Sequence, residues 1–405
     1  MTSTLDHSAA VSTLRSTTAI RERAQHLLRR ARAGDSAWFL VDDDALDHAA
    51  SEVARVTRTR YPTLAIPYHS RWRHFEAGGI DRRSELDSRA GNSGNAEQAR
   101  SMIDLAVVSV LLDAGAGSDW RYTEPGTGLQ LARSEGLGVA SWHAFCNGLF
   151  SSDPANPMQV DSAALSALDA QVVGRAFQTG PGNPLIGLAG RVRLLHRLGT
   201  QLAAHPEAFG QNGRPGELFD TVTGPTVSAH RLLTTLLDTL SEVWLTDNAI
   251  GGQALGDCWR HQAVPGLGFS RGWMPFHKLS QWLTYSLIEP FERAGVTVTD
   301  VDALTGLPEY RNGGLMLDTG VLRLRDAALA ERDWAVGDEL VVEWRALTVA
   351  LLDELAPLVR GHLGAPQLPM ACVLEGGTWA AGRELAVRLR DGRPPLSVSS
   401  DGTVF

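Results

Sequence analysis

The sequence predicts a mostly α, multi-helical globular fold with a small β element. Ten segments space their apolar residues at the three- and four-residue intervals typical of amphipathic helices. Only two short segments are rich in the β-branched and aromatic residues that favour strands. Strands do not alternate with helices along the chain, which argues against a doubly wound parallel sheet.

The predicted helices can be followed in order. In residues 17–34, apolar side chains recur at helical spacing until Gly34 ends the pattern. The helix over residues 43–62 begins at acidic residues and stops before Pro62, because the position preceding a proline disfavours helix. The remaining predicted helices span residues 95–117, 136–149, 163–177, 184–203, 225–245, 275–294, 337–362 and 371–390.

The strand candidates are residues 37–41 and 63–68, which predict a short sheet or β-pair beside the helices. Residues 206–226 are a long loop rich in Gly and Pro, which is typical of a functional loop or a linker. We therefore interpret residues 1–390 as a single helical catalytic domain, or as two helical lobes around loop 206–226. Residues 391–405 form a C-terminal tail that ends as an extended strand or a loose end.

Composition and charge exclude several classes of function. The chain of 405 residues has a formal net charge of −9 and no basic stripe, so we expect no nucleic-acid partner. No apolar run approaches the roughly 20 residues that cross a bilayer, so we expect no membrane association. The N-terminus lacks the pattern of a signal peptide. Three widely spaced cysteines imply no disulfide framework and fit a reducing, cytoplasmic setting. These features do not fix the oligomeric state.

The common cofactor motifs are absent from the sequence. It contains no G-x-x-x-x-G-K-[ST] loop and no G-x-G-x-x-G after a strand. H-E-x-x-H and G-x-S-x-G are also missing. We therefore predict no cofactor.

Residues 66–79, "IPYHSRWRHFEAGG", gather many hydrogen-bonding side chains in one short stretch. Arg71 and Arg73 are candidates to clamp a carboxylate or phosphate with forked hydrogen bonds. His69 and His74 are candidates to bind sugar hydroxyls or to move a proton. Trp72 is one of three aromatics in the stretch and counts among the binding candidates. The alternative is a structural polar network between helices.

Residues 247–261, "DNAIGGQALGDCWRH", contain a candidate pocket and a candidate metal pair. Asp257 is a candidate to line a pocket. Cys258 and His261 are three residues apart, which on a helix would place both ligands on one face. Two ligands do not make a zinc site and no second pair has suitable spacing, so we predict no metal. The alternative is a helix start in which Asp257 pairs with Arg260 or Arg271.

Residues 275–291 predict a helix with one polar face, formed by Lys278, Gln281, Tyr285 and Glu289. One Lys and one Glu beside a Tyr and a Gln are unusual for a solvated face. The face is therefore interpreted either as a pocket wall or as an exposed surface.

Residues 300–322 predict a helix, a tight "TGLPEYRNGG" turn and a second short helix. Such a turn can project Glu309, Tyr310 and Arg311 into a cleft. Partial desolvation beside Tyr310 would raise the pKa of Glu309 and suit acid–base or electrostatic work. The alternative is a connector whose side chains meet solvent.

Residues 374–384, "LEGGTWAAGRE", place two glycines inside a predicted helix, next to Glu375. Each glycine costs about 1 kcal/mol relative to alanine in a helix. A packing reason or a ligand reason is therefore expected, and the sequence does not choose between them.

Five stretches together resemble a known family: "IPYHSRWRHFEAGGIDR", "GGQALGDCWRH", "PFHKLSQWLTYSLIEP", "TGLPEYRNGG" and "LEGGTWAAGRE". The chain is similar, from about residue 20 to 390, to the fourth protein of the uracil-catabolism (ribosylurea) pathway of fungi and bacteria. That family was formerly a domain of unknown function. The resemblance implies a place in a pathway that converts uracil to a ribotide, opens the ring and passes through ribosylurea towards urea.

A second similarity is to the queuosine-salvage N-glycosylases. Lys278 and Gln281 match their Lys…Gln helix, and Glu309, Tyr310 and Arg311 match their Ala-Asp-Tyr-Arg turn. Glu309 stands where that family uses aspartate, and Pro308 replaces the small residue before it. "LTGLPEY" is also similar to the helix-hairpin-helix turn of DNA glycosylases, an analogy of fold alone that suggests a glycosylase-like arrangement.

These resemblances imply hydrolysis of the N-glycosidic bond of ribosylurea or its 5-phosphate. Glu309 is the expected catalytic carboxylate, with Asp257 or Asp318 as second choices, and His69 or His74 is the expected proton donor. The expected phosphate ligands are Arg71, Arg73, Lys278 and Arg311, and Trp72, Gln281, Tyr310 and Glu375 are further binding candidates. Two alternatives remain: an amidohydrolase of a ring-opened pyrimidine ribotide, and a non-catalytic pathway binding protein.

Overall fold

The computed structural model describes residues 2–91, 94–113 and 115–399. Within these residues it confirms a mostly α fold, with seventeen α-helices and small two-stranded sheets. The chain separates into two compact units, which we describe one at a time. The first unit comprises residues up to 69, 247–281 and 300–399, and the second unit comprises residues 70–246 and 282–299.

The first unit combines the N-terminal and C-terminal parts of the chain. Its helices are α1 (Thr2–Leu14), α2 (Thr17–Arg32), α3 (Leu46–Arg60), α14 (Tyr310–Asp318), α15 (Glu339–Leu363), α16 (Met370–Val373) and α17 (Trp379–Arg390), and α13 (Lys278–Arg293) begins here. Its antiparallel pairs are β1 (Phe39–Val41) with β10 (Leu322–Leu324), β5 (Ala249–Ile250) with β6 (Gln253–Ala254), and β7 (Cys258–Arg260) with β8 (Trp273–Pro275). Strand β11 (Asp333–Ala335) pairs in parallel with β12 (Ser397–Ser399).

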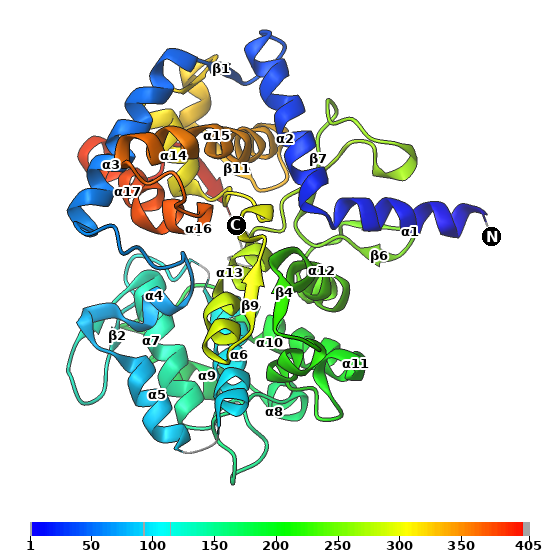
Figure 1. Cartoon of the computed structure of the whole chain (residues 1–405), viewed down its shortest axis with the longest axis vertical. Coiled ribbons are helices and arrows are strands. Elements are labelled where there is room, and N and C mark those ends of the chain that lie inside the picture. Colours follow the sequence, from blue (N-terminus) through cyan, green and yellow to red (C-terminus); the bar gives the residue numbers. More distant parts are fainter. Residues whose placement is uncertain (1, 92–93, 114, 400–405) are drawn as a thin grey trace. The chain divides into compact units, whose positions relative to one another are not determined.

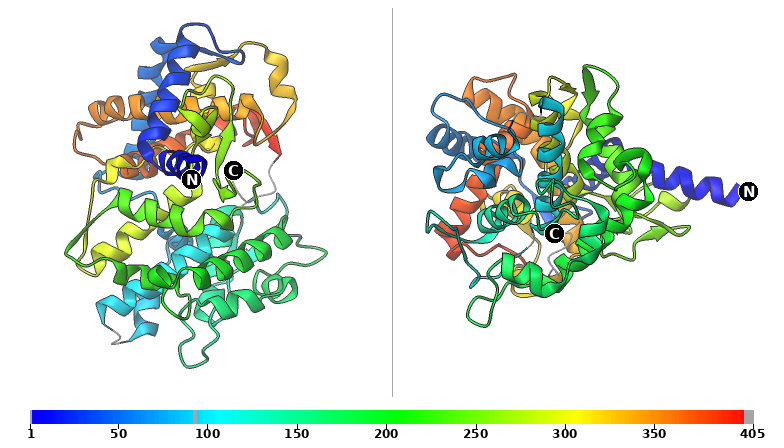
Figure 2. Two further views of the ribbon diagram at one scale, coloured as in Figure 1. Left: turned by 90° about the vertical axis from the view of Figure 1, so that its right-hand side faces the viewer. Right: turned by 90° about the horizontal axis from the view of Figure 1, so that it is seen from below.

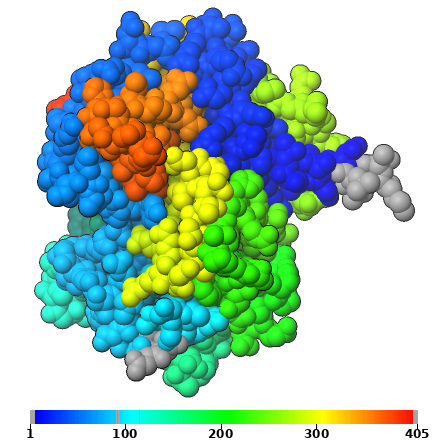
Figure 3. Space-filling model, viewed as in Figure 1, coloured from blue at the N-terminus to red at the C-terminus, as the bar shows by residue number. Residues whose placement is uncertain are grey.

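Helix α15 is the centre of the first unit. It is apolar around most of its circumference, and a helix of that kind is stable only when other elements cover it on several sides. Helices α2 and α3 pack against it, and α14 packs against both α15 and α17. Figure 1 shows blue α2 and α3 beside orange α15, and blue helices lie beside orange ones in the views of Figure 2. In the space-filling view of Figure 3, orange and blue atoms abut on the visible face.

The second unit contains the helices α4 (Trp72–Phe75), α5 (Arg82–Ala90), α6 (Asn95–Leu112), α7 (Arg133–Cys146), α8 (Ser162–Ala167), α9 (Ala170–Ala176), α10 (Leu188–Ala204), α11 (Pro206–Phe209) and α12 (Ala229–Leu240), together with most of α13. Strand β2 (Tyr122–Thr123) pairs antiparallel with β3 (Gln130–Leu131), and β4 (Thr226–Ser228) pairs in parallel with β9 (Thr297–Thr299). Helix α6 is buried from Ser101 to its end and packs against α7 and α10.

Loop 206–226 lies inside the second unit, where it forms α11 and further helical turns. Arg214 of this loop pairs with buried Asp104 of α6, and the Asp104 carboxylate also accepts the backbone N–H of Gly216 at 2.7 Å. These contacts attach the loop to the core of the second unit. The predicted C-terminal tail contributes β12, and residues 400–405 lie outside the described residues.

Each of the ten predicted helical segments contains a helix. Residues 163–177 divide into α8 and α9 because Asp169 caps a new helix there, accepting the backbone N–H groups of Gln171 and Val172. Helix α1 and the shorter helices α4, α5 and α11 were not predicted. Among the described residues, every helix is too short or too polar to traverse a lipid bilayer.

Of the two strand predictions, residues 37–41 are confirmed by β1, whereas residues 63–68 are not a strand. Leu64 has a φ of 58°, and its N–H donates to the carbonyl of Tyr61. This local turn, between Pro62 and Pro67, removes the extended backbone that strand pairing needs.

Candidate active site

Glu309 is the N-cap of α14 in the first unit. Its carboxylate accepts the backbone N–H of Asn312 at 2.6 Å and that of Arg311 at 2.7 Å. Burial raises the pKa of Glu309 above its usual range, although these N–H groups and the positive charges of Lys278 and His69 act in the opposite direction. The residue keeps some exposed surface. Glu309 is therefore an oriented, partly desolvated carboxyl group with two basic side chains near it.

The predicted turn around Glu309 is partly helix. Helix α14 begins at Tyr310, so Gly313 and Gly314 lie inside the helix and not in a turn. A Cβ on Gly313 would lie 2.7 Å from the ring of Trp344, whose Nε1 donates to the Gly313 carbonyl at 3.1 Å. The prediction was wrong here because glycine serves close packing of α14 against α15.

Gln281 fixes the segment that leads to Glu309. Its buried amide nitrogen donates to Thr305 Oγ1 at 2.8 Å and to the Phe276 carbonyl at 3.0 Å. Its amide oxygen accepts the backbone N–H of Thr305 at 2.8 Å. These bonds tie the first turn of α13 to the segment preceding Glu309.

Lys278 begins α13 and is the only lysine in the chain, which contains 37 Lys and Arg residues together. Its backbone N–H donates to Asp257 Oδ2 at 3.0 Å, and its charge acts on Glu309. The preceding residue, His277, has a φ of 50°, which is an uncommon conformation for a non-glycine residue. A compact ammonium group, chemically distinct from every other cation of the chain, is thus placed near Glu309.

Asp257 pairs with Arg345 of α15, not with Arg260 or Arg271 as the structural alternative predicted. Two guanidinium nitrogens donate to the two carboxylate oxygens at 2.8 Å each. Burial opposes ionisation of Asp257, but the Arg345 pair and further hydrogen bonds lower its pKa to about 2. Arg345 Nε also donates to the Pro308 carbonyl at 3.3 Å. Asp257 therefore stays ionised and connects the start of α13 to the residue before Glu309.

Cys258 and His261 do not share a helix face, because Cys258–Arg260 is strand β7. The Cys258 sulfur lies 3.6 Å from His277 Nε2, whereas His261 Nε2 lies 3.0 Å from a Glu343 carboxylate oxygen. The two side chains belong to different contacts, so the predicted spacing did not bring them together.

Glu375 gathers three donors in the first unit. Its Oε1 accepts Arg60 Nη2 at 2.9 Å and the Tyr61 hydroxyl at 3.0 Å. Its Oε2 lies 2.9 Å from His69 Nδ1. Burial opposes ionisation of Glu375, but the hydrogen bond from His69 and the charges of His69 and Arg60 lower its pKa to about 2. Glu375 is therefore an ionised carboxylate behind His69.

The two glycines after Glu375 have a packing reason. Residues Leu374–Thr378 form a π-helical turn between α16 and α17. A Cβ on Gly377 would lie 2.5 Å from the Val53 carbonyl and closer still to the Thr57 hydroxyl of α3. Glycine lets the turn approach the C-terminal half of α3, the helix that ends at Arg60. Single π-helical turns inside α-helices occur frequently at functional sites.

The side chains of the other first-unit candidates, Arg311 and Asp318, contact partners other than Glu309 and Glu375. Arg311 extends over the Tyr310 ring, 4.7 Å from its centroid, and its Nη1 donates to the Gly392 carbonyl at 3.3 Å. Asp318 ends α14 and accepts Arg390 Nη2 at 2.6 Å. It lies about 13 Å along the helix axis from Glu309, from a rise of about 1.5 Å per residue.

The second unit holds the remaining predicted residues, Arg71, Trp72, Arg73 and His74. Arg71 is fully buried, pairs with Asp113 at 3.0 Å and donates to His74 Nδ1 at 3.2 Å. Arg73 donates to both carboxylate oxygens of Glu289 at 2.9 Å. Trp72 is buried, and its Nε1 donates to the Ser286 carbonyl at 2.9 Å. These contacts form a polar network of the kind that the alternative interpretation described, and the ligand-binding roles of the four residues stay predictions.

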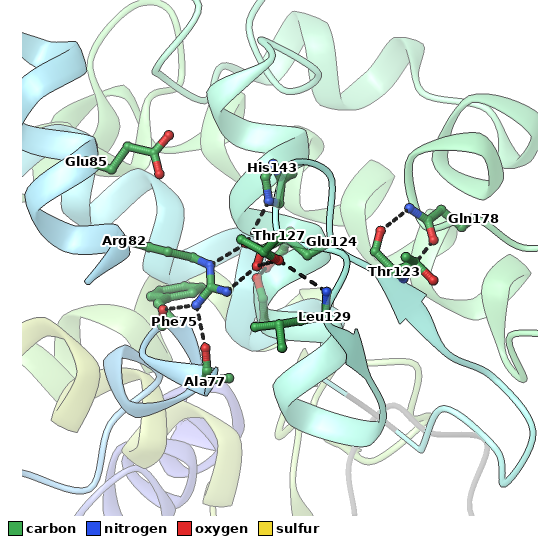
Figure 4. Close-up of polar contacts among 12 residues, drawn as sticks. Phe75, Ala77, Arg82, Glu85, Thr123, Glu124, Thr127, Leu129, His143 and Gln178 are labelled. Carbon is green, nitrogen blue, oxygen red and sulfur yellow. Dashed lines mark hydrogen bonds and ion pairs between the residues drawn. The ribbon is translucent and has the colours of Figure 1, made fainter. Parts of the chain in front are cut away.

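Another histidine–carboxylate pair, His143 with Glu124, lies in the second unit and is shown in Figure 4. Glu124, in the β2–β3 hairpin, accepts Arg82 Nε at 2.7 Å and Nη2 at 2.6 Å. It also contacts His143 Nε2 at 3.0 Å and accepts the Thr127 hydroxyl at 2.8 Å. Burial opposes ionisation of Glu124, but the Arg82, His143 and Thr127 hydrogen bonds lower its pKa to about 2.

Comparison with known proteins gives the family. Residues 13–405 match the family described as "Protein of unknown function (DUF1688)". The chain belongs to this family. The DUF1688 chain is 40% identical over 403 residues to "Protein urg3" of Schizosaccharomyces pombe, covering 95% of this chain and 96% of that protein. It is 38% identical over 399 residues to "Uracil catabolism protein 4" of Lachancea kluyveri, covering 90% of each. The predicted family resemblance is confirmed.

For this DUF1688 chain, sequence reasoning missed Arg60, Tyr61 and Arg345. Arg345 lies in the apolar run "LVVEWRALTVALL", where a charge must be paired if the helix is buried. The sequence therefore contained a signal that Arg345 forms a buried ion pair. Arg60 and Tyr61 carry no comparable signal, because their partner Glu375 is more than three hundred residues away in the chain.

Proposed function

We propose that this protein acts in uracil catabolism as a hydrolase of the N-glycosidic bond of ribosylurea or its 5-phosphate, releasing urea. The pathway assignment is supported by the name of one relative, "Uracil catabolism protein 4". The substrate follows from the resemblance described above. The reaction is supported by the chemistry of one residue, Glu309, and of the groups around it.

The proposal depends on one observation, the oriented and partly desolvated carboxyl group of Glu309. Cleavage of the bond between ribose C1 and a urea nitrogen develops positive charge on the sugar. A carboxylate that is held rigidly and partly removed from water stabilises such a charge better than a solvated one. The two N–H groups of α14 orient Glu309, and its raised pKa reports the desolvation.

His69 is the proposed proton donor to the leaving nitrogen. It belongs to the same unit as Glu309, and its charge acts on Glu309. In the proposed step His69 protonates the urea nitrogen as the C1–N bond breaks. Water then forms the new C1–O bond and gives its proton to Glu309. This proton afterwards returns from Glu309 through solvent to His69. The sum is ribosylurea and water to ribose and urea.

Lys278 is the basic residue that we assign to the substrate. Of the four predicted phosphate ligands, Arg71 and Arg73 pair with carboxylates of the second unit, and Arg311 extends towards Gly392. The charge of Lys278 lowers the pKa of Glu309. In the proposal its ammonium binds an oxygen of the ribose or of its phosphate.

The test is to incubate the purified full-length chain with synthetic ribosylurea, with ribosylurea 5-phosphate and with the ring-opened pyrimidine ribotide. We expect release of urea together with free ribose or ribose 5-phosphate. A carboxylic acid product that keeps its glycosidic bond would instead establish the amidohydrolase. Tight binding of all three compounds without any product would identify a binding protein and refute the proposal.

A further inference from the structure

The contacts of Glu375 determine the tautomer of His69: they fix which ring nitrogen donates a hydrogen bond to the carboxylate and which nitrogen takes part in proton transfer. An ionised carboxylate accepts hydrogen bonds and donates none. The 2.9 Å contact between Glu375 Oε2 and His69 Nδ1 therefore requires the proton to be on Nδ1. The proton that His69 releases or takes up in a reaction is then the one on Nε2. A carboxylate behind a histidine fixes ring tautomer and orientation in this way in hydrolases of unrelated folds.

Glu375 is itself held on its other oxygen. Arg60 Nη2 and the Tyr61 hydroxyl donate to Oε1, which leaves Oε2 directed at His69. Arg60 Nη1 also donates to the backbone carbonyls of Glu375 and Gly376, inside the π-helical turn. One guanidinium group thus fixes both the side chain and the backbone of the residue behind His69.

The backbone of His69 is fixed as well. Its N–H donates to the carbonyl of Ala371 in α16 at 3.0 Å, one turn before Glu375. The histidine and its carboxylate are therefore anchored to the same C-terminal segment, 371–376. A ring held at its backbone and at Nδ1 keeps little freedom to rotate, which is the requirement for a positioned proton donor.

We propose that Glu375 is a positioning residue that holds His69 as the proton donor, with Tyr61 and Arg60 setting its carboxylate. This inference rests on the proposed function. It assigns Glu375 a role behind the histidine, where the sequence predicted a contact with substrate.

The first test is Glu375→Gln in the full-length chain, with ribosylurea or its 5-phosphate as substrate. We expect kcat to fall on the order of 10⁴-fold, the scale of the loss when a carboxylate behind a catalytic histidine becomes an amide. KM should change only a few-fold, since Glu375 does not touch substrate. The alkaline limb of the kcat/KM profile should move to lower pH, because the negative charge that favours the imidazolium is gone.

The second measurement does not depend on turnover. A ring N–H bonded to a carboxylate gives a downfield proton resonance, and among the pairs whose carboxylate is buried we expect one from His69, one from His143 and one from His261, which contacts Glu343. Glu375→Gln should remove only the first resonance. The matched control Glu124→Gln should remove only the second and leave kcat and the pH profile of the folded protein unchanged.

Two outcomes overturn the inference separately from the proposed function. Turnover with an unchanged kcat and pH profile in Glu375→Gln refutes the positioning role alone. Absence of turnover by the unmodified protein refutes the proposed function, and the role of Glu375 falls with it. If Glu375→Gln does not fold, Tyr61→Phe tests the same carboxylate. It should lower kcat several-fold without moving the alkaline limb to lower pH, because Glu375 keeps its charge, and an unchanged kcat there also refutes the role.

Discussion

Glu375 in the first unit and Glu124 in the second are bound by the same kinds of side chain: an arginine, a hydroxyl group and a histidine. Burial opposes ionisation of both, and hydrogen bonds lower both pKa values to about 2. The arginines differ. Nη1 of each arginine donates to two backbone carbonyls, but Arg82 is 0% exposed, whereas Arg60 is 34% exposed.

The surroundings of the two carboxylates differ as well. The histidine of the Glu375 cluster acts on Glu309, a carboxyl group whose pKa is raised, whereas Arg82 ties the β2–β3 hairpin to the segment after α4. A histidine–carboxylate pair is therefore not by itself an indication of catalysis. What distinguishes the first cluster is a neighbouring acid whose pKa moves in the opposite direction, a pattern that separates acid and base roles in enzymes.

The largest expected effect is on stability, from Arg82→Met. Removing Arg82 leaves the buried carboxylate of Glu124 without its main partner, which costs about 3–5 kcal/mol of unfolding free energy. Urea denaturation followed by circular dichroism measures this loss. A loss below 1 kcal/mol would show that the Glu124 cluster is not a structural support.

The next effect is on activity, from Glu309→Gln. Removing one charge that stabilises a transition state costs about 10²–10³-fold in kcat, or about 3–4 kcal/mol. We expect a loss of this size in urea release, and a smaller one in Asp318→Asn at the opposite end of α14. The reverse order would transfer the catalytic role to Asp318, and full activity of Glu309→Gln would remove Glu309 from the mechanism.

Glu124 and Glu309 should also give opposite pH dependences of the unfolding free energy. Glu124 has a lowered pKa, so its contribution is present above the usual value of 4.5 and is lost as pH falls towards 2. That shift corresponds to about 3 kcal/mol. Glu309 has a raised pKa, so its contribution is present below 4.5 and is lost as pH rises through the raised value.

Unfolding free energies from pH 2.5 to 7 for the unmodified chain, Glu124→Gln and Glu309→Gln test this opposition. The difference between the unmodified chain and Glu124→Gln should grow with pH. The difference in unfolding free energy between the unmodified chain and Glu309→Gln should instead decrease as the pH rises above 4.5. Parallel curves would contradict the assigned directions.

Lys278→Arg is expected to have a smaller effect on catalysis. It keeps the charge but replaces a compact ammonium with a larger planar fork, so hydrogen bonding to an oxygen near Glu309 is displaced. We expect kcat/KM for urea release to fall about 10-fold, the equivalent of about 1.4 kcal/mol. Activity equal to that of the unmodified chain would show that only the charge matters.

The smallest effect is expected from Arg60→Met. Because Arg60 is partly exposed, solvent screens its interaction with Glu375, and we expect a loss of about 1 kcal/mol in unfolding free energy. The comparison with Arg82→Met in the same denaturation experiment is the informative quantity. Equal losses of unfolding free energy would mean that Arg60 and Arg82 stabilise the fold equally, contrary to the expected difference.

The sequence by itself determined the helical class, the approximate place of every long helix except α1, and the family. Those properties follow from apolar spacing over ten to twenty residues and from long unusual stretches, both of which are local. It also proposed Glu309, His69, Lys278 and Glu375 as site candidates, because unusual polar residues in helical or glycine-rich contexts are visible locally, and their roles stay predictions.

Only the tertiary structure decided the partners. Arg71 and Arg73 were predicted to bind ligand, yet they pair with Asp113 and Glu289, and Asp257 pairs with Arg345. A buried charge must find an opposite charge or hydrogen bonds wherever packing brings one. Packing joins residues tens to hundreds of positions apart, and no periodicity along the chain records which of them will meet.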